Sequence, residues 1–310
     1  MDAVSALLTA PRAQDAFLLR SVLRAPWALR VADEAPLTTL AVLRGSAWVV
    51  DDDGRATRVD AGDVALLRGP RPYTVADDPG TRPQVVVGPG QECAPVPGGE
   101  GRMTVLGVRT WGNDTAGETV LLTGTYPDPG EIGRRLVRAL PELAVVPRDA
   151  GTGALVGLLA DELAREAPGQ TAVLDRLLDV TLVSALRSWF DRPGAQAPGW
   201  YSAHADPVVG PALTLLHDEP ARPWTVDSLA GAVGVARATL ARRFTTLVGE
   251  PPMAYLTGWR IALATDLLRD PDLTLAAIAR RVGYATPFAL SAAVKRSTGR
   301  SPAAHRVAAG

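Results

Sequence analysis

The residues with the clearest chemical potential are arginines that recur at helical spacing near the carboxyl terminus. In residues 236–247, Leu240 and Phe244 lie about one helical turn apart and predict a buried face. Arg237 and Arg242 then fall on the open side. A guanidinium group there can donate hydrogen bonds to phosphate oxygens or to the edge of a guanine base. The segment is therefore suited to an anionic partner such as a nucleic acid.

A shorter helix must hold this one in place. Residues 224–230 predict its beginning, with Thr225 as the cap and Asp227 near the positively charged end. Gly234 follows closely and can adopt the positive φ of a tight turn. A short helix, a glycine turn and a second helix with exposed arginines is the geometry that enters the major groove of DNA. For Arg242 we therefore favour a DNA contact over an ordinary solvated position.

The same pattern recurs further along the chain. Residues 275–284 predict a helix that ends at a glycine turn, and Thr286 is placed to cap the next helix. Pro287 suits the first turn of that helix, which continues over residues 288–298. Residues 253–268 predict a helix that connects the two units. Two units on a rigid spacer could meet major-groove segments about 34 Å apart on one face of the duplex.

Charge is distributed unevenly along the chain. Residues 201–310 contain twelve basic and eight acidic side chains, a net charge of about +4, although the whole chain carries −1. The remainder of the chain therefore carries about −5. A basic tail on an acidic body fits a DNA-binding half joined to a half with another role.

Three features predict a cytoplasmic protein without membrane contact. Apolar stretches are too short to span a bilayer. The chain starts without the basic lead of a secretory signal. The single cysteine, Cys93, excludes an internal disulfide framework. Because Glu92 stands beside it and does not favour a thiolate, we interpret Cys93 as incidental rather than as a redox switch.

An ordered set of residues runs through both helical units. It comprises Leu240-Ala241-Arg242-Arg243-Phe244, Gly249-Glu250-Pro251-Pro252, Tyr255-Leu256, Trp259-Arg260, Ala276-x-Ile278-Ala279-x-x-Val282-Gly283-Tyr284, Lys295-Arg296, Gly299 and Ser301-Pro302. This set covers roughly residues 207–306 and resembles the AraC/XylS-type transcription regulators. The resemblance implies a sequence-specific DNA-binding regulator, an activator or a repressor.

The resemblance also implies which residues contact DNA. The base-facing positions are Ala238, Ala241 and Arg242 in the first unit, and Phe288, Ser291 and Ala292 in the second. Phosphate contacts, which position a protein without reading sequence, fall to Arg237, Lys295 and Arg296. We interpret Arg280 and Arg281, on a supporting helix, as an ordinary solvated face.

Four positions depart from the family pattern. Ala236 stands where a serine usually caps the first reading helix. In the second DNA-reading helix, residues 288–298, Ala292 stands where the family usually has a basic residue, and Val294 stands where it has a core phenylalanine. His305 stands where the family has an aromatic residue near the end of the domain. We therefore expect the second helix-turn-helix unit to make fewer polar contacts with DNA and to have a less bulky apolar core.

The first half of the chain predicts short strands separated by turns, which is typical of a barrel or sandwich. The turn signals are Gly45, Asp51-Asp52-Asp53-Gly54 and Ala61-Gly62-Asp63. A family resemblance also rests on the segments Trp27-x-Leu29-Arg30-Val31, Leu43-Arg44-Gly45-Ser46-Ala47-Trp48, Val64-x-Leu66-Leu67, Leu121-Leu122-x-Gly124-x-Tyr126 and Leu140-Pro141. Together they resemble the cupin-type barrel that precedes this DNA-binding unit in one AraC subgroup.

Catalytic cupins hold a metal with histidines and a carboxylate, but here Leu40 and Tyr73 occupy the motif positions. The only histidines are His204, His217 and His305, all outside the barrel segment. We therefore expect no metal, no cofactor and no enzymatic activity.

A metal-free sensor pocket is a further expectation. We expect Trp27, Arg30, Trp48 and Tyr73 to line it. The alternative, that Trp27 and Trp48 are barrel core, carries equal weight. Trp27 and Arg30 alternate on one strand, so one of them faces inward. An inward Arg30 would favour a carboxylate ligand, and an inward Trp27 an aromatic or apolar ligand.

The expected fold is a multidomain α and β protein. It comprises a cupin-like β-barrel in residues 1–130, a helical dimerisation region in 131–192, a linker in 193–204 and an all-α domain with two helix-turn-helix units in 205–310. Leucine stripes that include Leu174 and Leu182 place the expected homodimer interface on helices within residues 155–190. The alternative is that these helices pack only within the monomer. The other expected partners are double-stranded DNA, RNA polymerase and, if the barrel is a sensor, a small-molecule effector.

Two other functions fit parts of this pattern. A cupin enzyme or binding protein with a DNA-binding tail would show turnover or a bound metal in its N-terminal domain. A non-specific DNA binder would lose the preference for one site that separates specific from random DNA by several kcal/mol.

Overall fold

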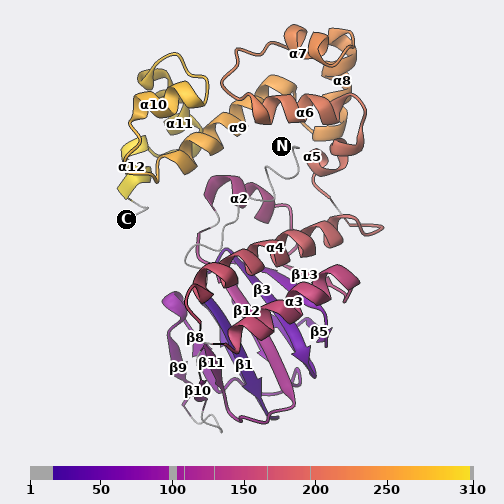
Figure 1. Ribbon diagram of the computed structural model, residues 1–310, viewed down its shortest axis with the longest axis vertical. Helices are drawn as coiled ribbons and strands as arrows, with labels where there is room; N and C mark the ends of the chain where they lie inside the picture. The colour runs from indigo at the N-terminus through magenta and orange to yellow at the C-terminus, as the bar shows by residue number, and fades with distance from the viewer. Residues whose placement is uncertain are drawn as a thin grey trace. The chain divides into compact units, whose positions relative to one another are not determined.

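The computed structural model describes residues 17–97, 103–107, 109–128, 130–165, 167–195 and 197–307. These form two compact units (Figure 1). The sandwich unit contains the described residues up to 128 together with 140–195, and the helical unit contains 130–139 together with 197–307. The chain therefore leaves the sandwich unit at residue 130 and returns to it at residue 140.

Two sheets face each other in the sandwich unit. The seven-stranded sheet has the order β10 (Thr104–Gly107), β11 (Thr110–Gly112), β1 (Phe17–Leu23), β12 (Thr119–Tyr126), β3 (Leu37–Arg44), β6 (Val64–Arg68) and β13 (Leu143–Val146). The six-stranded sheet has the order β5 (Ala56–Asp60), β4 (Ser46–Asp51), β7 (Tyr73–Ala76), β2 (Ala28–Val31), β8 (Val85–Val87) and β9 (Cys93–Pro95). A short 3₁₀ turn, Pro89–Gln91, joins the last two strands of that sheet.

Alternating side chains build the core between these sheets. On β3, Leu40 and Val42 belong to the apolar core, which also takes Val49 and Val75 from the facing sheet. Between β3 and β4 stands Gly45 with φ +75°, where a Cβ atom would lie only 3.0 Å from a backbone oxygen. This turn lets one continuous segment pass from the first sheet to the second. The predicted turns at residues 45 and 51–54 are confirmed, since the latter joins the paired strands β4 and β5.

Helices α3 (Ala150–Leu163) and α4 (Gln170–Phe190) cover the outer face of the seven-stranded sheet (Figure 1). The hydroxyl of Tyr126 donates to the carbonyl oxygen of Leu178 at 3.2 Å. Leu174 and Leu182 are 1% and 0% exposed, because they form part of this helix face. The expectation that they form a dimer interface is therefore wrong, since they are buried within one copy of the chain.

The structure corrects two further expectations for this half. The described strands form two sheets and no closed barrel. Residues 131–192 do not form a separate helical region, because β13 pairs with β6 while residues 130–139 belong to the helical unit. Strand β13 has only four residues, all apolar, and periodicity over so short a run cannot distinguish a strand from a helical segment.

The helical unit holds short helices around one long spacer. In chain order they are α2 (Gly130–Val137), α5 (Gly199–Ser202), the 3₁₀ turn Ala203–Ala205, α6 (Val209–Asp218), α7 (Val226–Ala232), α8 (Arg237–Val248), α9 (Pro252–Leu267), α10 (Leu275–Arg281), α11 (Pro287–Thr298) and α12 (Pro302–Val307). One apolar core surrounds α7 and α8, and a second surrounds α10 and α11. Helix α9 contributes side chains to both cores, so it connects the two predicted helix-turn-helix units.

Candidate nucleic-acid interface

Helix α8 presents the predicted open face. Leu240 and Phe244 are both 0% exposed, whereas Ala238 and Arg242 are exposed and Ala241 is half-buried. The glycine turn before α8 contains Gly234 with φ +73°. The helix is therefore held by its apolar stripe, and its opposite face is open to a partner.

Three arginines on α8 have different surroundings. Arg237 forms an ion pair with Asp227 at 3.0 Å, and Arg243 forms one with Asp206 at 2.7 Å. Burial pushes the pKa of Asp206 upward, but hydrogen bonds from backbone N–H groups and from Arg243 outweigh it, so the pKa is lowered overall. Arg242 forms no ion pair with any residue that the structure describes. Its guanidinium is thus the one on this helix not committed to an internal partner among the described residues.

Helix α11 presents the second open face. The Thr286 hydroxyl accepts a hydrogen bond from the backbone N–H of Ala289 at 3.1 Å, and Pro287 occupies the first turn as predicted. Phe288 is 83% exposed, which is unusual for a large aromatic side chain. Beyond it, Ser291 is half-buried, and the exposed positions are Ala292, Lys295 and Arg296. An apolar ring at this position can contact a thymine methyl group.

The two units differ in how their helices begin. Thr225 and Ser228 form a reciprocal capping box at the start of α7. Helix α8 begins after Ala236, whose side chain makes no capping hydrogen bond. The first backbone N–H groups of α8 are therefore left for water or for a bound phosphate oxygen.

The spacer helix is fixed by a polar cluster that sequence reasoning missed. The Nε2 atom of His217 lies 2.8 Å from the Tyr255 hydroxyl, and the His217 ring stacks on Trp259 with centroids 4.2 Å apart. Burial raises the pKa of Tyr255 well above its usual range, so this phenol stays neutral. Because a lone histidine at one end of α6 carries no pattern that points to α9, only the tertiary structure reveals this pairing.

Arg260 has a structural role on the same helix. Its Nε donates to the carbonyl oxygen of Pro220 at 2.7 Å, and Nη2 donates to that of Arg222 at 2.8 Å. Burial lowers the pKa of Arg260 from its usual value. These contacts hold the loop before α7 against the spacer, so this arginine is occupied inside the unit.

The four residues expected to line a sensor pocket are dispersed in the structure. Trp27 is 0% exposed in the sandwich core, and Arg30 points to the other face of β2, where it pairs with Asp52. Trp48 alternates with the core residues of β4 and is half-buried. Only Tyr73 lines the apolar cavity between the sheets, which measures about 70 Å³. Within the described residues, no cluster of His, Cys, Asp and Glu is arranged to hold a metal ion.

We expect base changes under α8 to cost more than equivalent changes under α11. The core around α8 includes the buried aromatic residues Trp224, Phe244 and Tyr255, whereas the described core around α11 contains no buried aromatic ring. Ala292 also offers no polar group to a base edge. A binding series with single base-pair changes, each worth about 1–3 kcal/mol when contacts are lost, measures the difference. Equal penalties in both segments would contradict this expectation.

Comparisons with known proteins agree with this geometry. The Cupin family matches residues 2–191, and a Helix-turn-helix domain family matches residues 229–307. Within the described residues, no helix is long and apolar enough to cross a membrane.

Similar proteins are transcription regulators. An AraC-like transcription regulator of Streptomyces lividans is 34% identical over 99% of this chain and 98% of its own length. The HTH-type transcriptional regulator AlkR of Acinetobacter baylyi is 27% identical over 99% of both chains. Among solved structures, the DNA-binding domain of AdpA, a global transcriptional factor in complex with a target DNA, is 33% identical with a TM-score of 0.31, and covers 34% of this chain and 93% of its own. With a cupin-like N-terminal domain and a C-terminal helix-turn-helix domain, this chain belongs to the AraC-like family of DNA-binding transcription regulators.

Proposed function

We propose that the protein recognises a specific operator through α8 and α11, with Arg242 and Phe288 as the principal base-contacting residues. The observation that carries this proposal is that α8 and α11 each pack one face on their own core and leave the opposite face open. Both cores include side chains of α9. Arg237, Lys295 and Arg296 bind phosphates and set the register. When DNA binds, a phosphate replaces the Asp227 carboxylate as the partner of Arg237, so the guanidinium stays paired.

Selection from a random DNA library tests this proposal. The full-length protein should enrich one bipartite site, and that site should compete against random DNA by about 4–10 kcal/mol. Enrichment of no common site, or equal competition by random DNA, would show a non-specific binder instead. The regulator would act in the cytoplasm, where RNA polymerase is its expected protein partner at the promoter.

The cavity in the sandwich supports a metal-free sensor for a largely apolar ligand. Its apolar lining includes Leu40 and Leu121, and its polar edge includes Tyr73 and Thr125. Thr125 is 3% exposed, and its hydroxyl oxygen has no hydrogen-bond partner among the described residues. A buried hydroxyl without a partner is costly, so a ligand with one polar group would satisfy it. With Arg30 directed outward, an apolar body fits this site better than a carboxylate.

A cavity-filling variant tests the sensor. We expect Thr123→Leu to remove the thermal stabilisation that a small apolar alcohol or amide produces in the wild-type protein, because the leucine side chain occupies the cavity. A ligand at one hundred times its Kd should stabilise the wild-type protein by about 2.7 kcal/mol. Arg30→Ala is the matched control, since Arg30 lies on a cavity strand but faces away. Loss of stabilisation in Arg30→Ala, or its retention in Thr123→Leu, would place the ligand elsewhere.

We propose that the protein is a homodimer through the outer face of α3 and α4. Three large apolar side chains are exposed on these helices: Leu158 at 53%, Val173 at 45% and Val180 at 51%. Their inner faces already cover the sheet, so only the outer face remains for a partner. A second copy of this chain offers the same apolar surface, as two-fold dimers require.

A further inference from the structure

Helix α2 lies in an unexpected place. In the sequence it falls between β12 and β13, which belong to the same seven-stranded sheet. In the structure, residues 130–139 belong to the helical unit, where α2 packs along the spacer helix α9. A segment from within the sensor domain is therefore part of the DNA-binding unit.

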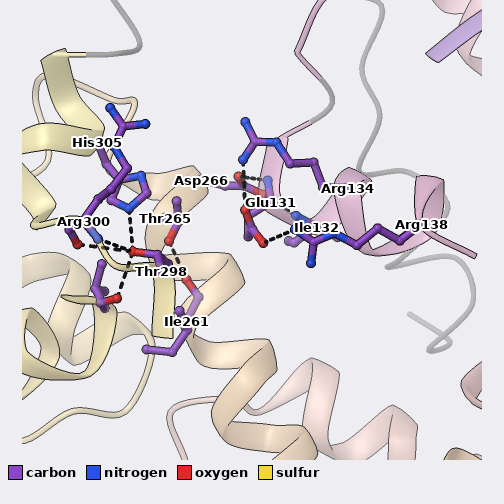
Figure 2. A network of polar contacts seen from close by, with 11 residues as sticks. Glu131, Ile132, Arg134, Arg138, Ile261, Thr265, Asp266, Thr298, Arg300 and His305 are labelled. Carbon is purple, nitrogen blue, oxygen red and sulfur yellow. Dashed lines mark hydrogen bonds and ion pairs between the residues drawn. The ribbon is translucent and has the colours of Figure 1, made fainter. Parts of the chain in front are cut away.

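A carboxylate on α9 caps α2. The two oxygens of Asp266 accept hydrogen bonds from the backbone N–H groups of Glu131, at 2.7 Å, and Ile132, at 3.2 Å (Figure 2). Gly130 precedes them with φ +70°, and a Cβ atom there would lie 2.9 Å from the Asp266 carboxylate. A glycine at this position thus permits both the backbone turn and the close approach of the carboxylate. The cap is specific, because α2 receives from α9 what a local N-cap residue usually supplies.

Packing along α9 extends this contact. Ile132 is 8% exposed and clusters with Trp259 and Ala262 of the spacer. The Arg135 guanidinium lies 5.9 Å from the centre of the Tyr255 ring. A Cβ atom at Gly258 would lie 2.4 Å from the Nη2 atom of Arg135, so this glycine leaves room for the Arg135 guanidinium.

The contact spans both helix-turn-helix units. Tyr255, next to Arg135, belongs to the core around α8, while α9 carries the core around α11 from Ile261 onward. Near the other end, Figure 2 shows Glu131 and Arg134 on α2 together with His305 of α12. Burial, followed by Arg300, lowers the pKa of His305, and the charges of Glu131 and Arg134 also act on it. Helix α2 thus reaches from the first helix-turn-helix unit toward the second.

We propose that α2 is a brace that fixes the spacing between the two DNA-reading helices and makes that spacing responsive to the sensor domain. The proposal rests on the regulator function given above. Strand β12 supplies Thr123 and Thr125 to the cavity and ends at Tyr126, four residues before Gly130. A ligand that shifts β12 can therefore change the docking of α2, to the extent that its affinity differs between the docked and released states. The docked brace is the operator-competent state.

Two variants release the brace in different ways. Ile132→Ala removes the side chain that contacts Trp259 and Ala262. Gly258→Leu obstructs Arg135 while replacing glycine with a good helix former in α9, so a weaker spacer cannot explain its effect. Ile278→Ala is the matched control, because Ile278 is 0% exposed in the core around α11 and lies outside the α2 cluster.

Spacing preference is the readout that separates a brace from ordinary stability. The full-length protein is titrated with its selected operator and with a copy that carries one extra base pair between the two contacted segments, which rotates them by about 34°. We expect both brace variants to bind the native spacing at least about fivefold more weakly, within the usual range of allosteric coupling. Their penalty for the insertion should be much smaller than that of the wild-type protein. Ile278→Ala should keep the full penalty.

Hydrogen exchange without DNA provides an independent test. In both brace variants the amides of residues 130–137 should exchange faster, and so should those of β12, while Ile278→Ala leaves both segments unchanged. Unchanged exchange in residues 130–137, or a full insertion penalty in the brace variants, would overturn the proposal. If no operator exists, the proposed function fails, but the exchange experiment still decides whether α2 and β12 are coupled.

Discussion

Arg242→Ala should weaken binding to the selected operator by about 1–3 kcal/mol, or roughly 5- to 150-fold in Kd. The reason is that Arg242 is exposed on α8 and forms no ion pair with a described residue, whereas Arg237 and Arg243 are paired. The loss should be confined to one base position, where the preference for guanine should relax. Titration of the operator and its single-base variants with wild-type and mutant protein measures both effects.

Arg280→Ala is the matched control for this experiment. Arg280 is an exposed arginine on α10, a supporting helix that we interpret as solvated. The Arg280→Ala variant should leave the base preference unchanged. Both Arg242→Ala and Arg280→Ala should unfold at the same temperature as the wild-type protein. Operator affinity that is unaffected by Arg242→Ala would remove Arg242 from the list of base contacts.

Leu158→Glu combined with Val180→Glu should convert the proposed homodimer into a folded monomer. Both side chains are about half exposed on the outer face of α3 and α4, and a pair of carboxylates on each copy would be desolvated and repelled in a two-fold interface. Operator affinity should fall by about 10²–10⁴-fold, because two linked DNA-binding units gain that much from simultaneous binding. Sedimentation at several concentrations, with parallel DNA titrations, gives both results.

Val105→Glu controls for the added charge. Val105 is 77% exposed on β10, an edge strand of the seven-stranded sheet and not part of either helix, so the Val105→Glu variant should remain dimeric. Leu174→Glu would be uninformative, since that side chain is buried against the monomer's own sheet and its replacement would unfold the unit. A double variant that stays dimeric would show that the two copies meet on another surface.

Local chemistry in the sequence was sufficient to predict many elements of the fold. The hydroxyl of Thr286 and the fixed φ of Pro287 determine where α11 begins, whatever surrounds that helix. The buried stripe of Leu240 and Phe244 likewise determines which face of α8 is open. These predictions succeed because capping and helical periodicity depend on residues within a few positions of one another.

Predictions about partners of a buried face depended on more than periodicity. The leucines of α4 were expected in a dimer interface, but the pattern is the same whether they pack on a sheet of the same chain or on a second copy. Arg30 and Trp27 were known to alternate, yet the inward choice of Trp27 followed from the packing of the facing sheet. The cavity and its unpaired Thr125 hydroxyl arise from several strands and have no local signature.

The sequence by itself determined the two helix-turn-helix units, the open face of the second helix in each and the β-rich character of the first half. Only the tertiary structure decided that the first half is an open two-sheet sandwich and that residues 130–139 leave it to pack on α9. The physical reason is that Asp266 and Gly130 lie more than a hundred positions apart in the chain. Neither residue is unusual in its own segment, and their mutual fit exists only when the folded chain brings them together.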